Sequence, residues 1–266
     1  MNKEEIVESA ARFTEDSPLN YVRAEDALDS SCSGMRFFDA PIFAFGLAND
    51  DIFTEFLSPG IIGEHFLPPK KWLPDAKTVI SFFLPYTERI RTANAADFRW
   101  PAIEWLHGRI EGQVFVAGLS EHIKKLLTDA GHSSLVPSLD SRFKTGSEHG
   151  RHTSNWSERH IAFACGLGTF GLSKGLITEK GTCGRFGSIV TELGLPVDQR
   201  LYKGFEEYCI KCCACIPNCP ADAISEEEGK NNTICSVFID MTREKHAPRY
   251  GCGKCQVGVP CESGRP

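Results

Sequence analysis

The sequence predicts an α+β protein that ends in a small cysteine-rich module. Helical and strand patterns alternate along the first two hundred residues, which is typical of mixed folds. Of the 12 cysteines, nine lie between residues 209 and 261. We therefore expect a larger domain over residues 1–200 and a module of separate character over residues 201–266.

Composition and charge limit what this protein can bind. The chain has 266 residues, of which 41% are hydrophobic, and this is enough for a conventional core. Its formal net charge of −6, from 35 acidic and 29 basic residues, disfavours nucleic acid and anionic membranes as partners. The charged N-terminus has no apolar signal core, and no apolar run reaches the ~20 residues of a membrane-spanning helix. We expect a cytoplasmic protein whose reduced cysteines bind metal or react rather than form disulfides.

The first half of the chain contains two helical segments and one clear strand. Residues 3–14 carry apolar side chains at helical spacing, and Asn2 can cap that helix. The run of β-branched and aromatic residues at 77–84 predicts a strand, which Pro85 ends. Residues 101–130 predict one long helix or two shorter ones, followed by a glycine stop.

The second half alternates short strands with one helix. That helix is capped by Ser154 or Asn155 and runs to about Ala164. Glycine-rich loops surround the remaining apolar runs, which we expect to be strands at 133–136, 176–178 and 188–193.

The cysteine-rich module begins with a motif that binds iron–sulfur clusters. Its first four cysteines have the spacing of bacterial ferredoxins, in the order Cys209-x2-Cys212-x2-Cys215-x3-Cys219-Pro220. In two-cluster proteins the first three thiolates bind one [4Fe–4S] cluster and the fourth binds the other. Further ligands must then lie downstream.

We predict two ligand sets, each of four cysteines. The first set is Cys209, Cys212, Cys215 and Cys261. The second set is Cys219, Cys235, Cys252 and Cys255. Cys213 is left over between two ligands, so it either points away or substitutes for a neighbour.

Structural zinc is the alternative occupant, because Cys-x2-Cys pairs also form tetrahedral zinc sites. The run of closely spaced ligands that ends in Cys-Pro favours iron–sulfur clusters instead. The remaining cysteines, Cys32, Cys165 and Cys183, have no ligand spacing, and we expect them to be small buried or loop residues.

A literal dinucleotide fingerprint lies upstream of the cysteines. The glycines of Gly166-Leu-Gly168-Thr-Phe-Gly171 match G-x-G-x-x-G. A nicotinamide site requires this motif to follow a strand and open a helix, whereas here it follows a helical pattern. We therefore do not expect a Rossmann site.

The order of these motifs resembles one known family. The segment SERHIAFACGLGTFGLSKGLIT is followed by GRFGSIVTEL and then by cysteines that include CGKCQ. Over about residues 75–261, this order resembles the epoxyqueuosine reductase family and, more distantly, the reductive dehalogenases. The resemblance implies a cobalamin in a fold related to flavin nitroreductases, with a ferredoxin-like module whose two [4Fe–4S] clusters pass electrons to cobalt.

The resemblance also implies which backbone segments approach the corrin. These are the loop that starts at Gly166 and the turn before Ser188, where glycine permits close backbone contact. The predicted cofactor-binding residues are Gly166, Gly168, Thr169, Phe170, Gly171, Ser173, Gly187 and Ser188.

The polar segment before the glycine loop holds the candidates for substrate chemistry. Members of the family carry an acidic proton donor about fourteen positions before the loop, where this chain has His152. Histidine can donate a proton near neutral pH. We predict catalytic roles for His152, Arg151 and Asp140. A turn and a surface charge are the simpler explanations for Asp140 and Arg142, and an ion pair or a helix start is the simpler explanation for Glu158 and Arg159.

These observations lead to one hypothesis and two alternatives. The hypothesis is an oxygen-sensitive oxidoreductase that takes electrons from a low-potential donor such as ferredoxin or flavodoxin and reduces a small molecule. An electron-transfer protein that serves a corrinoid protein or another redox partner is the first alternative. A flavin enzyme on the same fold is the second. We do not expect action on tRNA, because the net charge is negative and no helical-repeat segment follows the last cysteine.

Overall fold

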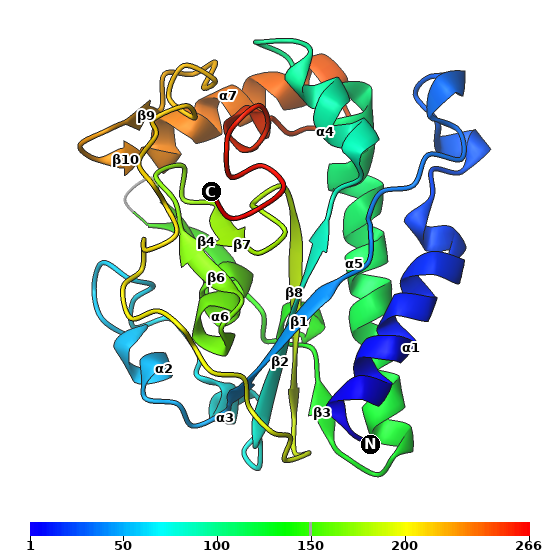
Figure 1. Cartoon of the computed structure of the whole chain (residues 1–266), viewed down its shortest axis with the longest axis vertical. Coiled ribbons are helices and arrows are strands. Elements are labelled where there is room, and N and C mark those ends of the chain that lie inside the picture. The colour runs from blue at the N-terminus through cyan, green and yellow to red at the C-terminus, as the bar shows by residue number, and fades with distance from the viewer. Residues whose placement is uncertain (149–150) are drawn as a thin grey trace.

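A four-stranded antiparallel sheet lies at the centre of the computed structural model (Figure 1). The structure describes the backbone of residues 1–148 and 151–266, and the side chains of residues 1–146 and 153–266. The sheet has the order β1 (Ile42–Leu47), β2 (Thr78–Pro85), β8 (Gly184–Thr191) and β3 (Ser134–Leu135). Three two-stranded sheets pair β4 (Thr145–Glu148) with β5 (Arg151–Ser154), β6 (Gly168–Phe170) with β7 (Leu176–Thr178), and β9 (Ile224–Ser225) with β10 (Gly229–Lys230).

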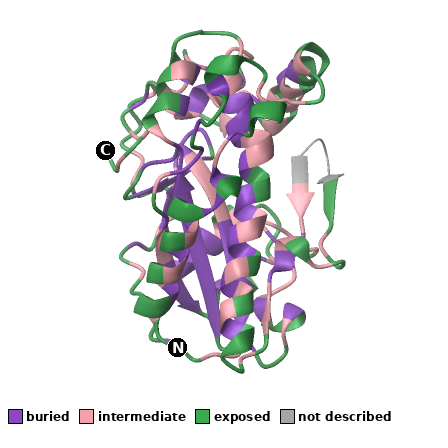
Figure 2. Ribbon diagram, turned by 90° about the vertical axis from the view of Figure 1, so that its right-hand side faces the viewer, coloured by how far each residue is buried: buried purple, intermediate pink, exposed green. Residues whose placement is uncertain are grey.

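Strand β2 is buried on both faces and divides the interior into two cores. Its side chains alternate, so that Ile80 and Phe82 enter one core while Val79 and Phe83 enter the other. This explains why its sequence is a continuous apolar run rather than an alternating one. Figure 2 shows the buried strands enclosed by helices whose outer faces are exposed.

Helices cover both faces of the sheet. On one face lie α1 (Lys3–Asp16) and α5 (Ile103–Asp129), and on the other lies α6 (Glu158–Cys165) (Figure 1). The cap of α1 is confirmed, because Asn2 Oδ1 accepts a hydrogen bond from Glu5 N at 2.9 Å. The segment 101–130 is one helix, not two. This mixed arrangement confirms the α+β prediction.

The other helices are shorter or lie toward the cysteines. The remaining α-helices are α2 (Ile52–Glu55), α3 (Pro69–Trp72), α4 (Glu88–Ala95) and α7 (Asn232–His246). Single 3₁₀ turns occupy Pro18–Asn20, Ala24–Asp26, Ser30–Cys32, Pro137–Leu139 and Lys254–Gln256. No helix in the described part of the chain has both the length and the apolar character needed to cross a membrane.

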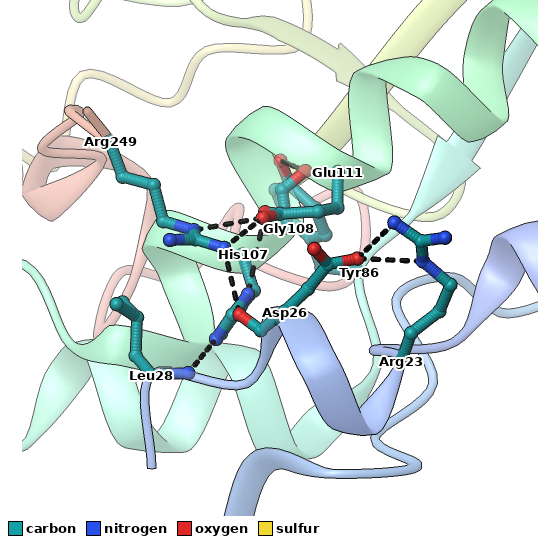
Figure 3. Close-up of polar contacts among 8 residues, drawn as sticks. All are labelled: Arg23, Asp26, Leu28, Tyr86, His107, Gly108, Glu111 and Arg249. Atoms are coloured by element: carbon teal, nitrogen blue, oxygen red, sulfur yellow. Dashed lines mark hydrogen bonds and ion pairs between the residues drawn. The ribbon is translucent and has the colours of Figure 1, made fainter.

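A polar network attaches the C-terminal segment to α5 (Figure 3). Arg249 donates to the Glu111 carboxylate through Nε at 2.8 Å and also through its terminal nitrogen, and it donates to the Asp26 carbonyl at 2.8 Å. His107 accepts from the Leu28 amide at 3.1 Å, and its other ring nitrogen lies 3.4 Å from Glu111. The cysteine-rich segment is therefore held to the larger domain by partly buried ionic contacts.

Backbone packing against Trp105 strengthens this attachment. Gly253 has a φ of +68°, and a Cβ placed there would lie 1.8 Å from the Trp105 ring. We expect Gly253→Ala to lower the free energy of unfolding by about 2–4 kcal/mol, since it adds overpacking to left-handed strain. Denaturant unfolding would measure this change. Gly264→Ala is the control, because no atom lies within 4 Å of a Cβ there, and equal stability of both variants would contradict the packing argument.

Candidate iron–sulfur and cofactor site

Electrostatic interactions connect the cysteines of the first predicted ligand set with one another and with the second set. Burial raises the pKa of Cys261 to about 11, and the next contribution comes from the thiol of Cys209. Burial likewise raises the pKa of Cys215 to about 12, with contributions from Cys255 of the second set and from Cys261 and Cys209. Cys212 also contributes at Cys261 and is the exposed member of the set.

The second predicted ligand set also converges, at a more buried position. Burial raises the pKa of Cys252 to about 12, and Cys255 and Cys235 raise it further. Cys255 is 9% exposed and interacts with the thiols of Cys235 and Cys219. Helix α7 supplies Cys235 to this set. The assignment of both sets as cluster ligands stays a prediction.

The leftover Cys213 has a backbone hydrogen-bond partner of its own, although the thiols of Cys212 and Cys209 also act on it. Its φ is +58°, and its Sγ lies 3.3 Å from the carbonyl oxygen of Lys211. Within residues 1–148 and 151–266, no three Cys, His, Asp or Glu side chains meet closely enough to hold one metal ion.

The three upstream cysteines are buried, as expected. Cys32, Cys165 and Cys183 are all at most 1% exposed. Burial raises the pKa of each thiol, which keeps it protonated. Cys165 donates a weak hydrogen bond to the Val79 carbonyl at 3.6 Å.

The glycine loop connects a helix to a strand, which excludes the dinucleotide-binding arrangement. Helix α6 ends at Cys165, and Gly166 follows in the left-handed conformation at φ +106°. Strand β6 then begins at Gly168. A Rossmann motif has the reverse order, strand before helix.

This loop lies directly against the segment that leads into the first ligand set. Thr169 Oγ1 accepts from the Tyr208 amide at 2.8 Å, and the Phe170 amide donates to the Phe205 carbonyl at 2.6 Å. A Cβ on Gly171 would lie 3.8 Å from Cys209 Sγ. The predicted cofactor loop and a predicted cluster ligand are therefore in contact.

Packing within the protein accounts for two of the predicted cofactor-binding glycines. A Cβ on Gly168 would lie 1.9 Å from the Ile177 carbonyl oxygen, and one on Gly187 would lie 2.3 Å from the Phe82 ring. These glycines allow close approach of neighbouring strands. Their contact with a corrin stays a prediction, as does that of Ser173, whose hydroxyl accepts from the Gly175 amide at 3.4 Å.

A buried carboxylate meets Ser188 beside the same loop. Ser188 Oγ donates to Glu158 Oε2 at 2.6 Å and accepts from Trp156 Nε1 at 2.9 Å. Burial raises the pKa of Glu158 to about 7, even though hydrogen bonds from Ser188 and Ser138 act in the opposite direction. Its Oε1 makes no hydrogen bond of good geometry in the described part of the chain. Glu158 can therefore hold a proton near neutral pH.

Two arginines, Arg159 and Arg185, lie on the elements that carry Glu158 and Ser188. Arg159 is exposed and Arg185 is half-buried, and burial lowers the pKa of both guanidinium groups. Arg185 also lowers the pKa of Arg159, and Arg109 lowers that of Arg185. Arg159 donates to the Lys174 carbonyl at 2.6 Å, and Arg185 donates to Gln113 Oε1 on α5. Arg159 comes from α6 and Arg185 from the start of β8.

The three predicted catalytic residues have different outcomes. The backbone of Arg151 and His152 lies in β5, but their side chains lie outside the described residues. Asp140 accepts from Arg142 Nε at 2.8 Å and from its amide at 2.9 Å. These hydrogen bonds lower the pKa of Asp140, which disfavours proton donation by this carboxylate. The turn that was the simpler explanation for Asp140 is what the structure contains.

The local sequence predicts only a helix-start acid at Glu158 and not a buried carboxyl with a raised pKa. Ser188, its hydrogen-bond donor, lies 30 residues away on another strand. Nothing local in the sequence reveals that partner. The pairing of β8 with β2, which fixes where Ser188 points, is the missing information.

Comparisons with known proteins agree with the order of these motifs. No protein-family model matches the chain. A curated epoxyqueuosine reductase from Bacillus cereus is 26% identical over 207 residues, which cover 74% of this chain and 51% of that protein. The chain thus spans about half the length of this relative.

Solved structures with the same fold fall in two groups. An epoxyqueuosine reductase with an epoxyqueuosine-modified tRNA-Tyr stem loop has a TM-score of 0.55 at 18% identity, covering 99% of this chain and 66% of that one. A catabolic reductive dehalogenase in complex with 3-bromo-4-hydroxybenzoic acid has a TM-score of 0.55 at 14% identity, covering 98% and 36%. A further reductive dehalogenase, described in terms of B12-dependent dehalogenation, has a TM-score of 0.50 at 15% identity, covering 80% and 29%. These similarities confirm the resemblance that the sequence predicted.

Proposed function

Starting from the kinship of this chain with epoxyqueuosine reductases and reductive dehalogenases, we propose that it is a reductase that uses cobalamin and two [4Fe–4S] clusters. Residues 1–200 would form the nitroreductase-related cobalamin domain, and residues 201–266 the ferredoxin-like module. A reducing cytoplasm is the compartment in which such clusters would persist.

The contact between Gly171 and Cys209 is the observation that carries this proposal. It puts the first ligand set against the loop that the resemblance assigns to the cofactor. The chemistry of the donors also fits, because the thiols of both predicted sets lie within electrostatic range of one another. Glu158, which can hold a proton near neutral pH, meets Ser188 of the predicted cofactor-binding residues.

Glu158, Ser188 and the two arginines would supply the proton and bind the substrate. When bound, cobalamin would supply the reducing centre and the clusters its electrons. Glu158 would hold the proton that the substrate receives, and Ser188 would orient its carboxylate. Arg159 and Arg185 would attract an anionic or electron-rich substrate.

The substrate class is open to two kinds of molecule. The expectation that tRNA is excluded has no support, since one structural relative holds a tRNA stem loop. A small halogenated or otherwise reducible aromatic compound is our preferred substrate, because the net charge of −6 opposes the binding of a long polyanion. Ferredoxin or flavodoxin would supply the electrons.

Anaerobic reconstitution followed by electron paramagnetic resonance tests the cofactor. We expect added cob(II)alamin to lose the splitting from its axial nitrogen, because the protein would bind it without that ligand. An unchanged spectrum in a protein that holds full iron and sulfide would contradict the cobalamin proposal and favour an electron carrier. Absorbance after acid precipitation would then identify a flavin enzyme.

A further inference from the structure

The two ligand sets differ in the cations around them. Lys230 Nζ lies 4.0 Å from Cys255 Sγ, and its charge also acts on Cys252. Lys230 is only half-exposed, at the end of β10. Arg159 lies close enough to Cys255 and Cys235 for these thiols to affect the pKa of its guanidinium group.

The first set has a different environment. Cys212 is exposed to solvent. The neighbouring Lys211 is 61% exposed, and its Nζ lies 3.9 Å from Glu206, so water and a carboxylate screen its charge.

Charge near an iron–sulfur cluster changes its reduction potential. Reduction adds one electron, so burial disfavours the reduced form and a nearby cation stabilises it. The second set is the more buried one, with Cys219 and Cys255 each 9% exposed. Without a cation its cluster would be the harder of the two to reduce.

We propose that Lys230 reverses this order and makes the cluster of the second set the one with the higher reduction potential. This inference rests on the proposed function, because it requires clusters on both sets. One electron would pass from a low-potential carrier protein to the cluster of the first set at exposed Cys212. From there it would pass to the cluster of the second set, which oxidises the first again. The electron would then lie near Arg159 of α6, the helix that ends at the glycine loop.

A redox titration of the reconstituted protein, followed by electron paramagnetic resonance, tests this inference. In the unmodified protein we expect the cluster signals to appear at two separate potentials. In Lys230→Gln the higher of the two should shift to a more negative value and fall below the other, which should stay unchanged. Lys230→Arg keeps the charge and should keep the separation. Lys211→Gln is the matched control and should shift neither signal appreciably, since its charge is already screened.

The outcomes separate this inference from the function on which it rests. Two intact clusters whose potentials both stay at the wild-type values in Lys230→Gln would overturn the role of Lys230 and leave the proposed function standing. A reconstituted wild-type protein without iron and acid-labile sulfide would overturn both. Because iron and sulfide are assayed in each variant, loss of a cluster cannot be mistaken for a shift in potential.

Discussion

Replacing Cys209 by alanine is expected to reduce the iron of the reconstituted protein from about eight atoms per chain to about four, or to leave an incomplete cluster. The same result is expected for Cys261→Ala, although 52 residues separate the two cysteines, because their thiols lie close together. Iron and sulfide analysis with electron paramagnetic resonance would measure the loss. Zinc bound in place of iron would rule out the cluster assignment.

The two sets can be distinguished by combining variants. Cys209→Ala and Cys261→Ala together should lose no more iron than either alone, since both remove the same cluster. Cys209→Ala combined with Cys235→Ala should lose both clusters. Cys213→Ala is the control and should keep full iron, because its thiol is directed to the Lys211 carbonyl. A loss of iron in Cys213→Ala would mean that the ligand sets are assigned incorrectly.

Glu158→Gln is expected to slow substrate reduction by about 10²- to 10⁴-fold, the range for loss of a general acid. In the proposed reaction the protonated form of Glu158 would be the donor, and the pKa of this carboxyl is about 7. The wild-type rate should therefore fall as pH rises through about 7, and the variant should lack this dependence. Turnover of epoxyqueuosine in a tRNA stem loop, or of a brominated phenol, would measure it. A variant that keeps both the rate and the pH profile would exclude Glu158 as the donor.

The same substitution should stabilise the fold at high pH. The pKa of Glu158 is raised from 4.5 to about 7 in the folded protein. Below pH 4.5 the carboxyl is protonated in both states and does not lower the free energy of unfolding. As pH rises from 4.5 to about 7, it lowers the free energy of unfolding increasingly. Glutamine does not ionise, so the variant should gain up to about 3 kcal/mol at pH 8 relative to wild type. Denaturant unfolding at pH 5 and pH 8 would measure the difference. Trp156→Phe is a structural control, because it removes a donor to Ser188 without removing the acid.

The sequence was most informative where its signal is local. The helix at Lys3–Asp16, the long helix and the strand at Thr78–Pro85 follow from spacing, a cap and a proline. The ferredoxin spacing likewise identifies its own chemistry, because three ligands lie within seven residues.

Elements stabilised by distant contacts could not be predicted in this way. The predicted helix cap at Ser154 or Asn155 was wrong, and α6 begins at Glu158. Asn155 instead bonds to the Lys144 amide at 2.9 Å and the Arg142 carbonyl at 2.8 Å, which closes the hairpin β4–β5. Strand β1 was not among the predicted elements, because it is defined by its pairing with β2, which begins 36 residues later in the chain.

The site shows the same division between local and distant information. The cysteine spacing suggested both ligand sets, whereas the pairing of Glu158 with Ser188 required the fold to bring β8 beside α6. Lys230 could not be selected, since many lysines are surface residues and only the fold puts this one 4.0 Å from Cys255.

Cluster insertion and the folding of the larger domain should form one linked equilibrium. The link is the network of Arg249, Glu111 and Asp26, together with the packing of Gly253 against Trp105. A cluster that binds only the folded cysteine segment stabilises every element to which that segment is attached. Filling the ligand sets should therefore raise the thermal midpoint of α5 as well as that of the cysteine module, and chelation of iron should lower both. In a cell, the iron supply would then determine the fraction of the protein that is folded and therefore escapes proteolysis.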